Sequence, residues 1–307
     1  MIEVQDLAKS FGSVEAVRGV SFSVGRGEIV GFLGPNGAGK TTTMRMLTGI
    51  FPPTSGSIRI AGHDPLADPI ACRRTVGYFP EYAPFYPDLR VAGYLQFVAR
   101  MKRIPRAERD VAVVRALKSA GLEHVRDRRI GTLSKGYRQR VGIAQALCGD
   151  PPILILDEPT IGLDPGQVVE IREFVGGLRG TRTVLFSSHI LSEVEALCER
   201  VIVIAQGKVV GEGTPAALNE RLGRRQRIRL RTDGPLDAVK AALSALPIVS
   251  EVAIEADGLR LDATAGDIAR AVGETMRTHG WLVLELHQEA VDLEDVFIQL
   301  VADGAGQ

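Results

Sequence analysis

The chain has 307 residues, a length typical of about two domains. Its 37 basic and 37 acidic side chains give a formal net charge of zero, so overall charge does not favour a nucleic acid as the main partner. The sequence shows no apolar run long enough to span a bilayer and no secretory signal pattern. Three scattered cysteines fit buried, reduced thiols better than disulfides or a metal site.

The first 80 residues predict strands and tight turns with one helix. Apolar and polar residues alternate in two early segments, as in half-buried strands, and a continuous apolar segment follows them. A helix is expected from Gly39 through Leu47, before two prolines end it. The expected strands lie at residues 2–4, 17–24, 28–33 and 75–79, with a hairpin at 56–62.

Between the apolar strand and the helix, the chain carries a glycine-rich phosphate-loop motif of the form G-x-x-x-x-G-K-[ST]. Backbone N–H groups can approach phosphate oxygens closely only where no Cβ obstructs them, and the helix N-terminus adds partial positive charge. Lys40 is expected to reach the β- and γ-phosphates and Thr41 to hold Mg²⁺. The residues predicted to contact the nucleotide here are Gly34, Pro35, Asn36, Gly37, Ala38, Gly39, Lys40, Thr41 and Thr42.

The middle of the chain changes character after residue 80. A loop at residues 81–87 contains prolines and aromatic residues, and the segment 91–147 has helical periodicity. Beyond it, apolar strands alternate with helices, which is typical of a buried and largely parallel sheet. The strands are expected at residues 153–156, 183–186 and 201–204, and the helices at 167–178 and 191–197.

Two acids, Asp157 and Glu158, follow the first of these apolar strands. Charges are costly inside an apolar strand, so both acids are expected at its carboxyl end, where open α/β sheets bind ligands. Asp157 is expected to support the Mg²⁺ shell, and Glu158 to act as general base toward an attacking water. Taken alone, the pair also fits a solvated strand end.

The motif series in residues 1–220 resembles the nucleotide-binding subunit of ATP-binding cassette (ABC) transporters. The segment 133–137, Leu-Ser-Lys-Gly-Tyr, looks like that family's signature sequence. The resemblance implies an α/β phosphate-loop NTPase core of ABC ATPase type, with ATP and Mg²⁺ as cofactors and an inserted helical subdomain at about 82–150. It also implies that Ser134 and Gly136 of one subunit close over the γ-phosphate held by a second copy.

The resemblance assigns three further positions. Asp164, in Gly-Leu-Asp, matches the family's loop across the dimer interface, and His189 matches its γ-phosphate-sensing histidine. Phe11 stands where the family stacks an aromatic ring on adenine, although packing in the core is the alternative for this side chain. The expected catalytic residues are Lys40, Glu158 and His189.

Two positions depart from the usual family pattern. Glu81 replaces the usual Gln, and its carboxylate joins Thr41 and Asp157 as an expected metal ligand. Lys135 and Tyr137 replace the commoner Gly and Gln of the signature. These residues, with the ending Leu-Glu-Asp-Val-Phe at 293–297, resemble the subgroup that serves multidrug, gliding-motility and type 2 permeases.

A second unit is expected at residues 224–307. Its order of strand, helix, two strands, helix and strand predicts a small α+β domain with the ferredoxin-like plan, without a catalytic constellation. A regulatory or dimer-bracing role is expected for it. The elements are predicted at residues 227–231, 236–246, 250–256, 258–262, 266–278 and 281–286, with a last helix at 293–301.

The first strand of the second unit alternates Arg227, Arg229 and Arg231 with apolar residues, which places the arginines on one face. A solvated face is one interpretation of this pattern. Contact with lipid headgroups or with a permease loop is the other.

The predicted function is an ATP-hydrolysing subunit that dimerises around two ATP molecules and powers an exporter. Its partner is expected to be a separate permease with about six membrane spans, and the chain is expected on the cytoplasmic face of the membrane. Phe85 and Tyr86 are candidates for contacting this permease; packing beneath their own loop is the alternative. A soluble cassette ATPase acting on nucleic acid or ribosomes is the competing function. A nucleotide-gated protein without turnover fits less well, because Glu158 and His189 are both present.

Overall fold

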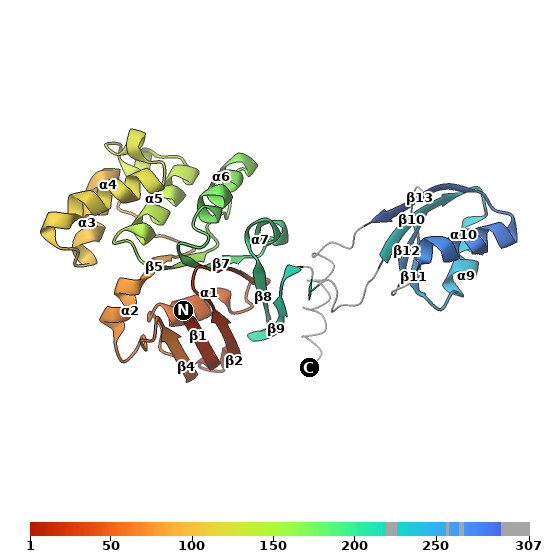
Figure 1. Ribbon diagram of the computed structural model, residues 1–307, viewed down its shortest axis with the longest axis horizontal. Coiled ribbons are helices and arrows are strands. Elements are labelled where there is room, and N and C mark those ends of the chain that lie inside the picture. The colour runs from red at the N-terminus through yellow and green to blue at the C-terminus, as the bar shows by residue number, and fades with distance from the viewer. Residues whose placement is uncertain (216, 219–225, 256–257, 264–266, 290–307) are drawn as a thin grey trace. The chain divides into compact units, whose positions relative to one another are not determined.

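The computed structural model describes residues 1–215, 217–218, 226–255, 258–263 and 267–289 (Figure 1). The chain divides into two compact units, one containing Met1–Glu212 and the other beginning at Gly213. The boundary predicted from the sequence, between residues 220 and 224, falls on residues outside the described ranges. The two units are therefore described separately.

A six-stranded sheet with the order β5-β6-β7-β3-β8-β9 forms the centre of the first unit. The neighbouring strands from β5 to β8 pair in parallel, so the carboxyl ends of β3, β6 and β7 lie at one edge. Every residue of β3 and β6 is buried, as expected for apolar strands covered on both faces. The strands are β3 (Ile29–Leu33), β5 (Val76–Phe79), β6 (Ile153–Asp157), β7 (Thr183–Ser188), β8 (Arg200–Ala205) and β9 (Lys208–Gly213).

An antiparallel sheet with the order β2-β1-β4 shares a hydrophobic core with the parallel sheet. Helix α1 contributes Met44, Met46 and Leu47 to this core. Figure 1 shows the three strands near the N-terminus, with α1 and α2 beside them. The elements are β1 (Ile2–Phe11), β2 (Val14–Val24), α1 (Lys40–Leu47), β4 (Ser55–Ile60) and α2 (Pro69–Thr75). Helix α2 and strand β9 were not predicted from the sequence.

The helical segment has its own hydrophobic core, built from α3, α4 and α5. Figure 1 shows these three helices grouped together, and α6 and α7 follow them along the chain. The partly buried Phe85 and Tyr137 also pack against this core. The helices are α3 (Val91–Met101), α4 (Arg109–Ser119), α5 (Lys135–Leu147), α6 (Pro165–Gly176) and α7 (Leu191–Leu197). Short 3₁₀ turns lie at Arg106–Glu108, Glu123–Val125 and Ile130–Thr132.

A buried ammonium group satisfies the carboxyl end of α5. Lys102 Nζ donates hydrogen bonds to the carbonyl oxygens of Gln145 and Ala146, each at 3.0 Å, and of Cys148 at 2.7 Å. Carbonyl groups in the last turn of a helix lack the usual backbone donor four residues on, and a cation also complements the negative end of the helix dipole. Burial lowers the pKa of Lys102 to about 8. The lysine therefore ties the end of α3 to the end of α5.

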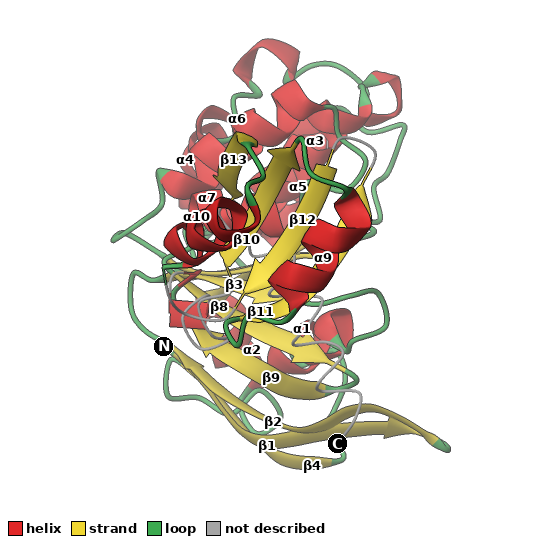
Figure 2. Cartoon of the chain, turned by 90° about the vertical axis from the view of Figure 1, so that its right-hand side faces the viewer, coloured by secondary structure: helices red, strands yellow, loops and turns green. Residues whose placement is uncertain are grey.

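The second unit has the predicted element order and an antiparallel sheet with the order β11-β12-β10-β13. This is the ferredoxin-like arrangement, in which the first strand lies between the third and the fourth. Figures 1 and 2 show α9 and α10 on one face of the sheet, and both helices contribute to its core. The elements are β10 (Gln226–Thr232), α9 (Leu236–Ser244), β11 (Val249–Glu255), β12 (Gly258–Ala263), α10 (Ile268–His279) and β13 (Val283–Glu289). The predicted last helix at 293–301 lies outside the described residues.

The arginine-bearing strand β10 supports the solvated interpretation of its charged face. Arg231 forms an ion pair with Glu285 at 3.3 Å, and Arg229 lies 3.9 Å from Glu255. These side chains are exposed and carry their own counter-charges, so this face has little excess positive charge to offer a lipid surface.

No helix within the described ranges combines the length and the apolar character needed to cross a membrane.

Strand β5 and helix α5 pack so closely at Gly77 that a side chain at this position should destabilise the fold. A Cβ at Gly77 would collide with the backbone carbonyl oxygen of Ala146, which cannot move without displacing the helix. We expect Gly77→Ala to lower the free energy of unfolding by about 1–3 kcal/mol, as measured by denaturant titration. Gly93→Ala is the matched control, because its Cβ meets nothing within 4 Å on α3 and should stabilise the helix by up to about 1 kcal/mol. Equal stabilities for the two variants would contradict this packing.

Candidate functional site

The loop between β3 and α1 has the backbone geometry that its glycines predict. Gly39 has a φ of 102° in the left-handed region, and a Cβ there would lie 2.6 Å from the carbonyl oxygen of Ala16. A larger residue is therefore excluded on conformational and steric grounds. Helix α1 begins at Lys40 without a side-chain cap, so its first backbone N–H groups are free to face an anion.

Lys40 is buried and folds back over the loop that precedes it. Its Nζ donates to the carbonyl oxygens of Gly34 at 2.7 Å and Pro35 at 3.3 Å. The same atom lies 3.2 Å from Glu158 Oε1. The side chain therefore brings a positive charge beside a buried carboxylate.

Asp157 and Glu158 stand at the carboxyl end of β6, as predicted, and both are buried. Asp157 Oδ1 accepts hydrogen bonds from Ser187 Oγ at 2.8 Å and from Thr41 Oγ1 at 3.3 Å. Its Oδ2 is buried without a hydrogen-bond partner. Burial raises the pKa of Asp157, and the nearby Glu81 and Glu158 carboxylates raise it further, while the two hydroxyls oppose the shift. The pair is therefore not a solvated strand end.

His189 follows β7 and meets the second of these acids. Its Nδ1 lies 2.8 Å from Glu158 Oε2. Glu158 itself has a φ of 49°, in the region that non-glycine residues rarely adopt, and its backbone N–H donates to Ser187 Oγ at 3.0 Å. The ends of β6 and β7 thus combine with Lys40 into one cluster of titratable side chains.

The oxygen atoms near Asp157 fit a Mg²⁺ ion. This hard cation prefers oxygen ligands and is usually bound by one or two protein groups together with phosphate oxygens and water. Asp157 Oδ2 is an orphaned buried acceptor, and the Thr41 hydroxyl lies beside the other oxygen of the same carboxylate. Among the described residues, no group of three or more His, Cys, Asp and Glu side chains could hold a metal by itself. The site therefore suits a cation that arrives with a phosphate ligand.

The predicted signature segment lies at the start of α5, within the helical segment. Ser134 caps this helix, accepting a hydrogen bond from the Tyr137 backbone N–H at 3.4 Å. A Cβ at Gly136 would collide with the side chain of Gln167. Within the part of the chain that the structure describes, no hydrogen bond joins Ser134 or Gly136 to the loop at residues 34–41.

Comparisons with known proteins decide the family. The family model described as "ABC transporter" matches residues 17–161. The linearmycin resistance ATP-binding protein LnrL of Bacillus subtilis is 33% identical over 304 residues, 98% of each chain. The bacitracin transport ATP-binding protein BcrA of Bacillus licheniformis is 35% identical over 99% of this chain and 98% of its own. This chain belongs to the ABC transporter ATP-binding proteins.

Solved structures of ABC cassettes show the same fold. An ATP-binding subunit of an ABC transporter has a TM-score of 0.66 and 31% identity, covering 72% of this chain and 93% of its own. The cassette MJ0796, in a post-hydrolysis state with ADP and Pi, has a TM-score of 0.63 and 26% identity over 70% of this chain and 98% of its own. The chain is thus an ABC ATPase, with the predicted α/β cassette fold.

Other predicted residues of this ABC ATPase lie in defined surroundings. Phe11 is 45% exposed and stacks edge-on against Phe51, so it is not a core side chain. Asp164 caps α6, accepting a hydrogen bond from the Gln167 backbone N–H at 3.0 Å. Glu81 is partly exposed, and its charge reaches Asp157.

Several contacts near the predicted site residues were not predicted from the sequence. Ser187 bonds to both acids of β6, and the run of two serines before the histidine was the available signal. Tyr137 OH lies 3.0 Å from His124 Nε2, and the two rings meet edge to face. Nothing in the sequence pairs these two residues, because the contact joins a 3₁₀ turn to a separate helix.

The uncompensated acid at the end of β6 predicts a pH-dependent stability. Because the pKa of Asp157 is raised in the folded chain, its contribution is complete below the ordinary carboxyl pKa and is lost as the pH rises through the raised value. Without nucleotide or Mg²⁺, we expect Asp157→Asn to increase the free energy of unfolding more at about pH 7 than at about pH 4. Denaturant titration of both proteins measures the difference. A difference that does not depend on pH would show that the carboxylate is compensated in the free chain.

Proposed function

We propose that the residues gathered at the ends of β3, β6 and β7 bind ATP with Mg²⁺ and hydrolyse it between two copies of the chain. The observation that carries this proposal is the contact of one carboxylate with two other groups: Glu158 meets Lys40 at 3.2 Å and His189 at 2.8 Å. A cation, a carboxylate and an imidazole thereby converge where the phosphate loop ends. Such a set neutralises phosphate charge and activates water in the same place.

Each residue has a separate role in this mechanism. When nucleotide binds, the Lys40 side chain moves so that its ammonium group leaves Glu158 and contacts the β- and γ-phosphates. The Glu158 carboxylate is then free. Thr41 and Asp157 would hold the Mg²⁺, which would supply positive charge to neutralise the developing phosphate charge. Glu158 then accepts a proton from the attacking water as general base. Its partner His189 donates from Nδ1 to the Glu158 carboxylate, which fixes the tautomer and orients the base.

A second copy of the chain completes each site in this proposal. Ser134 and Gly136 at the start of α5 would face the γ-phosphate held by the partner, and Asp164 would lie at the interface between copies. A two-fold arrangement makes both sites equivalent. The dimeric structure of the cassette MJ0796, which is 26% identical with a TM-score of 0.63, supports this arrangement.

We infer further that the ATPase powers export through a separate membrane protein. Relatives that match nearly the whole chain are named for bacitracin transport and linearmycin resistance, and others for Nod factor export. ATP would favour the closed dimer and hydrolysis would release it, driving a permease with about six spans. The ATPase then acts at the cytoplasmic face of the membrane. The competing function, action on nucleic acid or ribosomes, finds no support in these relatives or in the zero net charge.

The contact surface for this permease is proposed near the junction of the core and the helical segment. Tyr82 and Tyr86 are 78% and 54% exposed, and the Tyr86 ring also meets those of Tyr94 at 6.3 Å and Phe97 at 5.6 Å. Phe85 is partly buried and packs against the Tyr94 ring at 5.9 Å within the helical core. Their exposure makes the tyrosines, Tyr82 above all, better contact candidates than Phe85.

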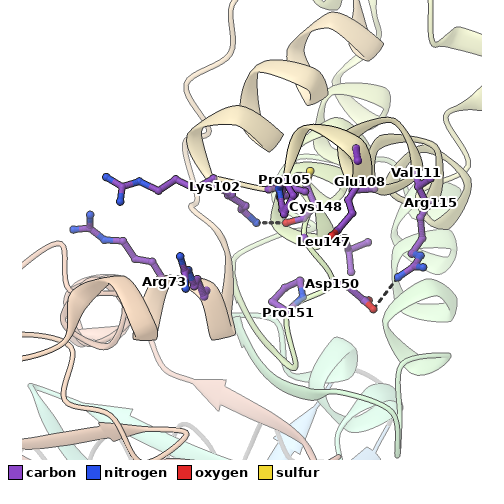
Figure 3. A pocket seen from close by; sticks show the side chains of 16 residues that line it. Arg73, Lys102, Pro105, Glu108, Val111, Arg115, Leu147, Cys148, Asp150 and Pro151 are labelled. Atoms are coloured by element: carbon purple, nitrogen blue, oxygen red, sulfur yellow. Dashed lines mark hydrogen bonds and ion pairs between the residues drawn. The ribbon is translucent and has the colours of Figure 1, made fainter.

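A hollow of about 650 Å³ lies between α2 and the end of α3 and is lined by apolar and basic residues. Its lining includes Arg73, Arg74 and Arg103, none of which has an ion pair among the described residues. The same arginines line an adjoining hollow, where Figure 3 shows Arg73 and Lys102. Unpaired cations beside exposed apolar residues suit an acidic, amphipathic segment of the permease.

Replacing the general base tests the catalytic proposal. We expect Glu158→Gln to retain ATP binding and to lower turnover by about 100-fold or more, because the amide cannot accept the proton from water. ATP should then hold the dimer closed, which size-exclusion chromatography with light scattering detects. Glu173→Gln, at an exposed position of α6, is the matched control. Full turnover by the Glu158 variant would exclude this residue as the base.

Replacing the exposed tyrosines tests the permease surface. In membranes that contain both proteins, we expect Tyr82→Ser with Tyr86→Ser to reduce permease-stimulated ATPase activity by about fivefold or more, because buried aromatic anchors dominate interface energies. Basal activity of the isolated chain should be unchanged. Val169→Ser, an exposed apolar residue on α6, serves as the control. Stimulation at the wild-type level would show that the loop at residues 81–87 is not part of the permease interface.

A further inference from the structure

A buried carboxylate outside the nucleotide site joins the two segments that carry the base and the histidine. Glu193 lies on α7, and its Oε2 accepts hydrogen bonds from Thr160 Oγ1 at 2.7 Å and from Ser188 Oγ at 2.9 Å. Thr160 follows Glu158 by two residues, and Ser188 directly precedes His189. One carboxylate oxygen therefore contacts both segments.

The alternation of side chains along β7 gives its last two serines different partners. Successive residues of a strand point to opposite faces. Ser187 donates to Asp157 on the metal side, whereas Ser188 donates to Glu193 on the side of α7. Ser188 Oγ also accepts the backbone N–H of Ile190 at 2.9 Å, which closes the turn around the histidine. The end of β7 is thus held from both faces.

Holding a short helix against a sheet with a buried carboxylate has a high cost in desolvation free energy. Glu193 is buried and forms no ion pair among the described residues, so only hydrogen bonds offset the cost of removing its charge from water. An apolar residue of similar volume would pack α7 at lower cost. Hydrogen bonds to an ionised acceptor are short, strong and directional. A need to fix the positions of the two segments therefore explains the buried Glu193 carboxylate better than a gain in stability does.

We propose that Glu193 is a positioning residue for ATP hydrolysis. By fixing the segments that contain Thr160 and Ser188, it keeps His189 Nδ1 at 2.8 Å from Glu158 Oε2. This inference rests on the proposed function, in which those two residues act on the attacking water. Glu193 works only through the two segments and touches no reacting atom.

Steady-state ATP hydrolysis by the full-length chain tests the proposal. We expect Glu193→Ala to lower kcat by about tenfold to a hundredfold, with a change in the KM for ATP of less than about twofold, because the phosphate loop is untouched. Glu193→Gln should recover most of this loss, since its amide oxygen accepts the same two hydrogen bonds. In a His189→Ala background, Glu193→Ala should cause a smaller further loss than in the wild type, because one of the two groups that it positions is gone.

The control is Ser192→Ala, an exposed position on the same helix, which should leave kcat and KM unchanged. Wild-type kcat in Glu193→Ala, or losses that multiply in the double variant, would overturn the proposal. If Glu193→Ala does not fold, Thr160→Val and Thr160→Ser decide the question, because only valine removes the hydroxyl. A lower kcat for valine alone supports the proposal, and equal values reject it. Absence of ATPase activity in the wild type would instead reject the proposed function, and this inference with it.

Discussion

The buried acids at the end of β6 are the constraint on which the rest of the nucleotide site depends. The carboxylates of Asp157 and Glu158 are both buried at the end of this strand. One oxygen atom of each has no hydrogen bond. In the described chain, Lys40 partly offsets Glu158, while Asp157 has only two hydroxyls beside its other oxygen. In the proposed function, ATP and Mg²⁺ would bring the groups that compensate this unfavourable charge. Binding and folding are therefore linked through the same residues.

The parallel sheet makes this concentration of charge possible. Its strands end at one edge, so three loops that are far apart in the sequence deliver Lys40, Glu158 and His189 to one place. The two serines at the end of β7 then hold the acids and α7 on opposite faces. The catalytic geometry is thus a consequence of strand alternation as much as of the motifs themselves.

The features that could be predicted from the sequence are those in which one short segment contains the whole requirement. The phosphate loop needs glycines, a lysine and a helix start in eight successive residues, and the acids need only an apolar strand before them. Contacts between distant segments could not be predicted. Lys102 caps α5 from α3, Tyr137 meets His124, and Glu193 joins two loops, because tertiary packing alone brings these partners together. Helix α2 and strand β9 were missed because both are short and only weakly periodic.

The exchange of partners by Lys40 is the central claim, and a crystal structure with a non-hydrolysable ATP analogue and Mg²⁺ tests it most directly. We expect Lys40 Nζ to leave Glu158 Oε1 and to contact the β- and γ-phosphates. We also expect Asp157 Oδ2 to face the cation and Ser134 of a second copy to face the γ-phosphate. A complex in which Lys40 remains paired with Glu158, with the nucleotide bound elsewhere, would contradict it.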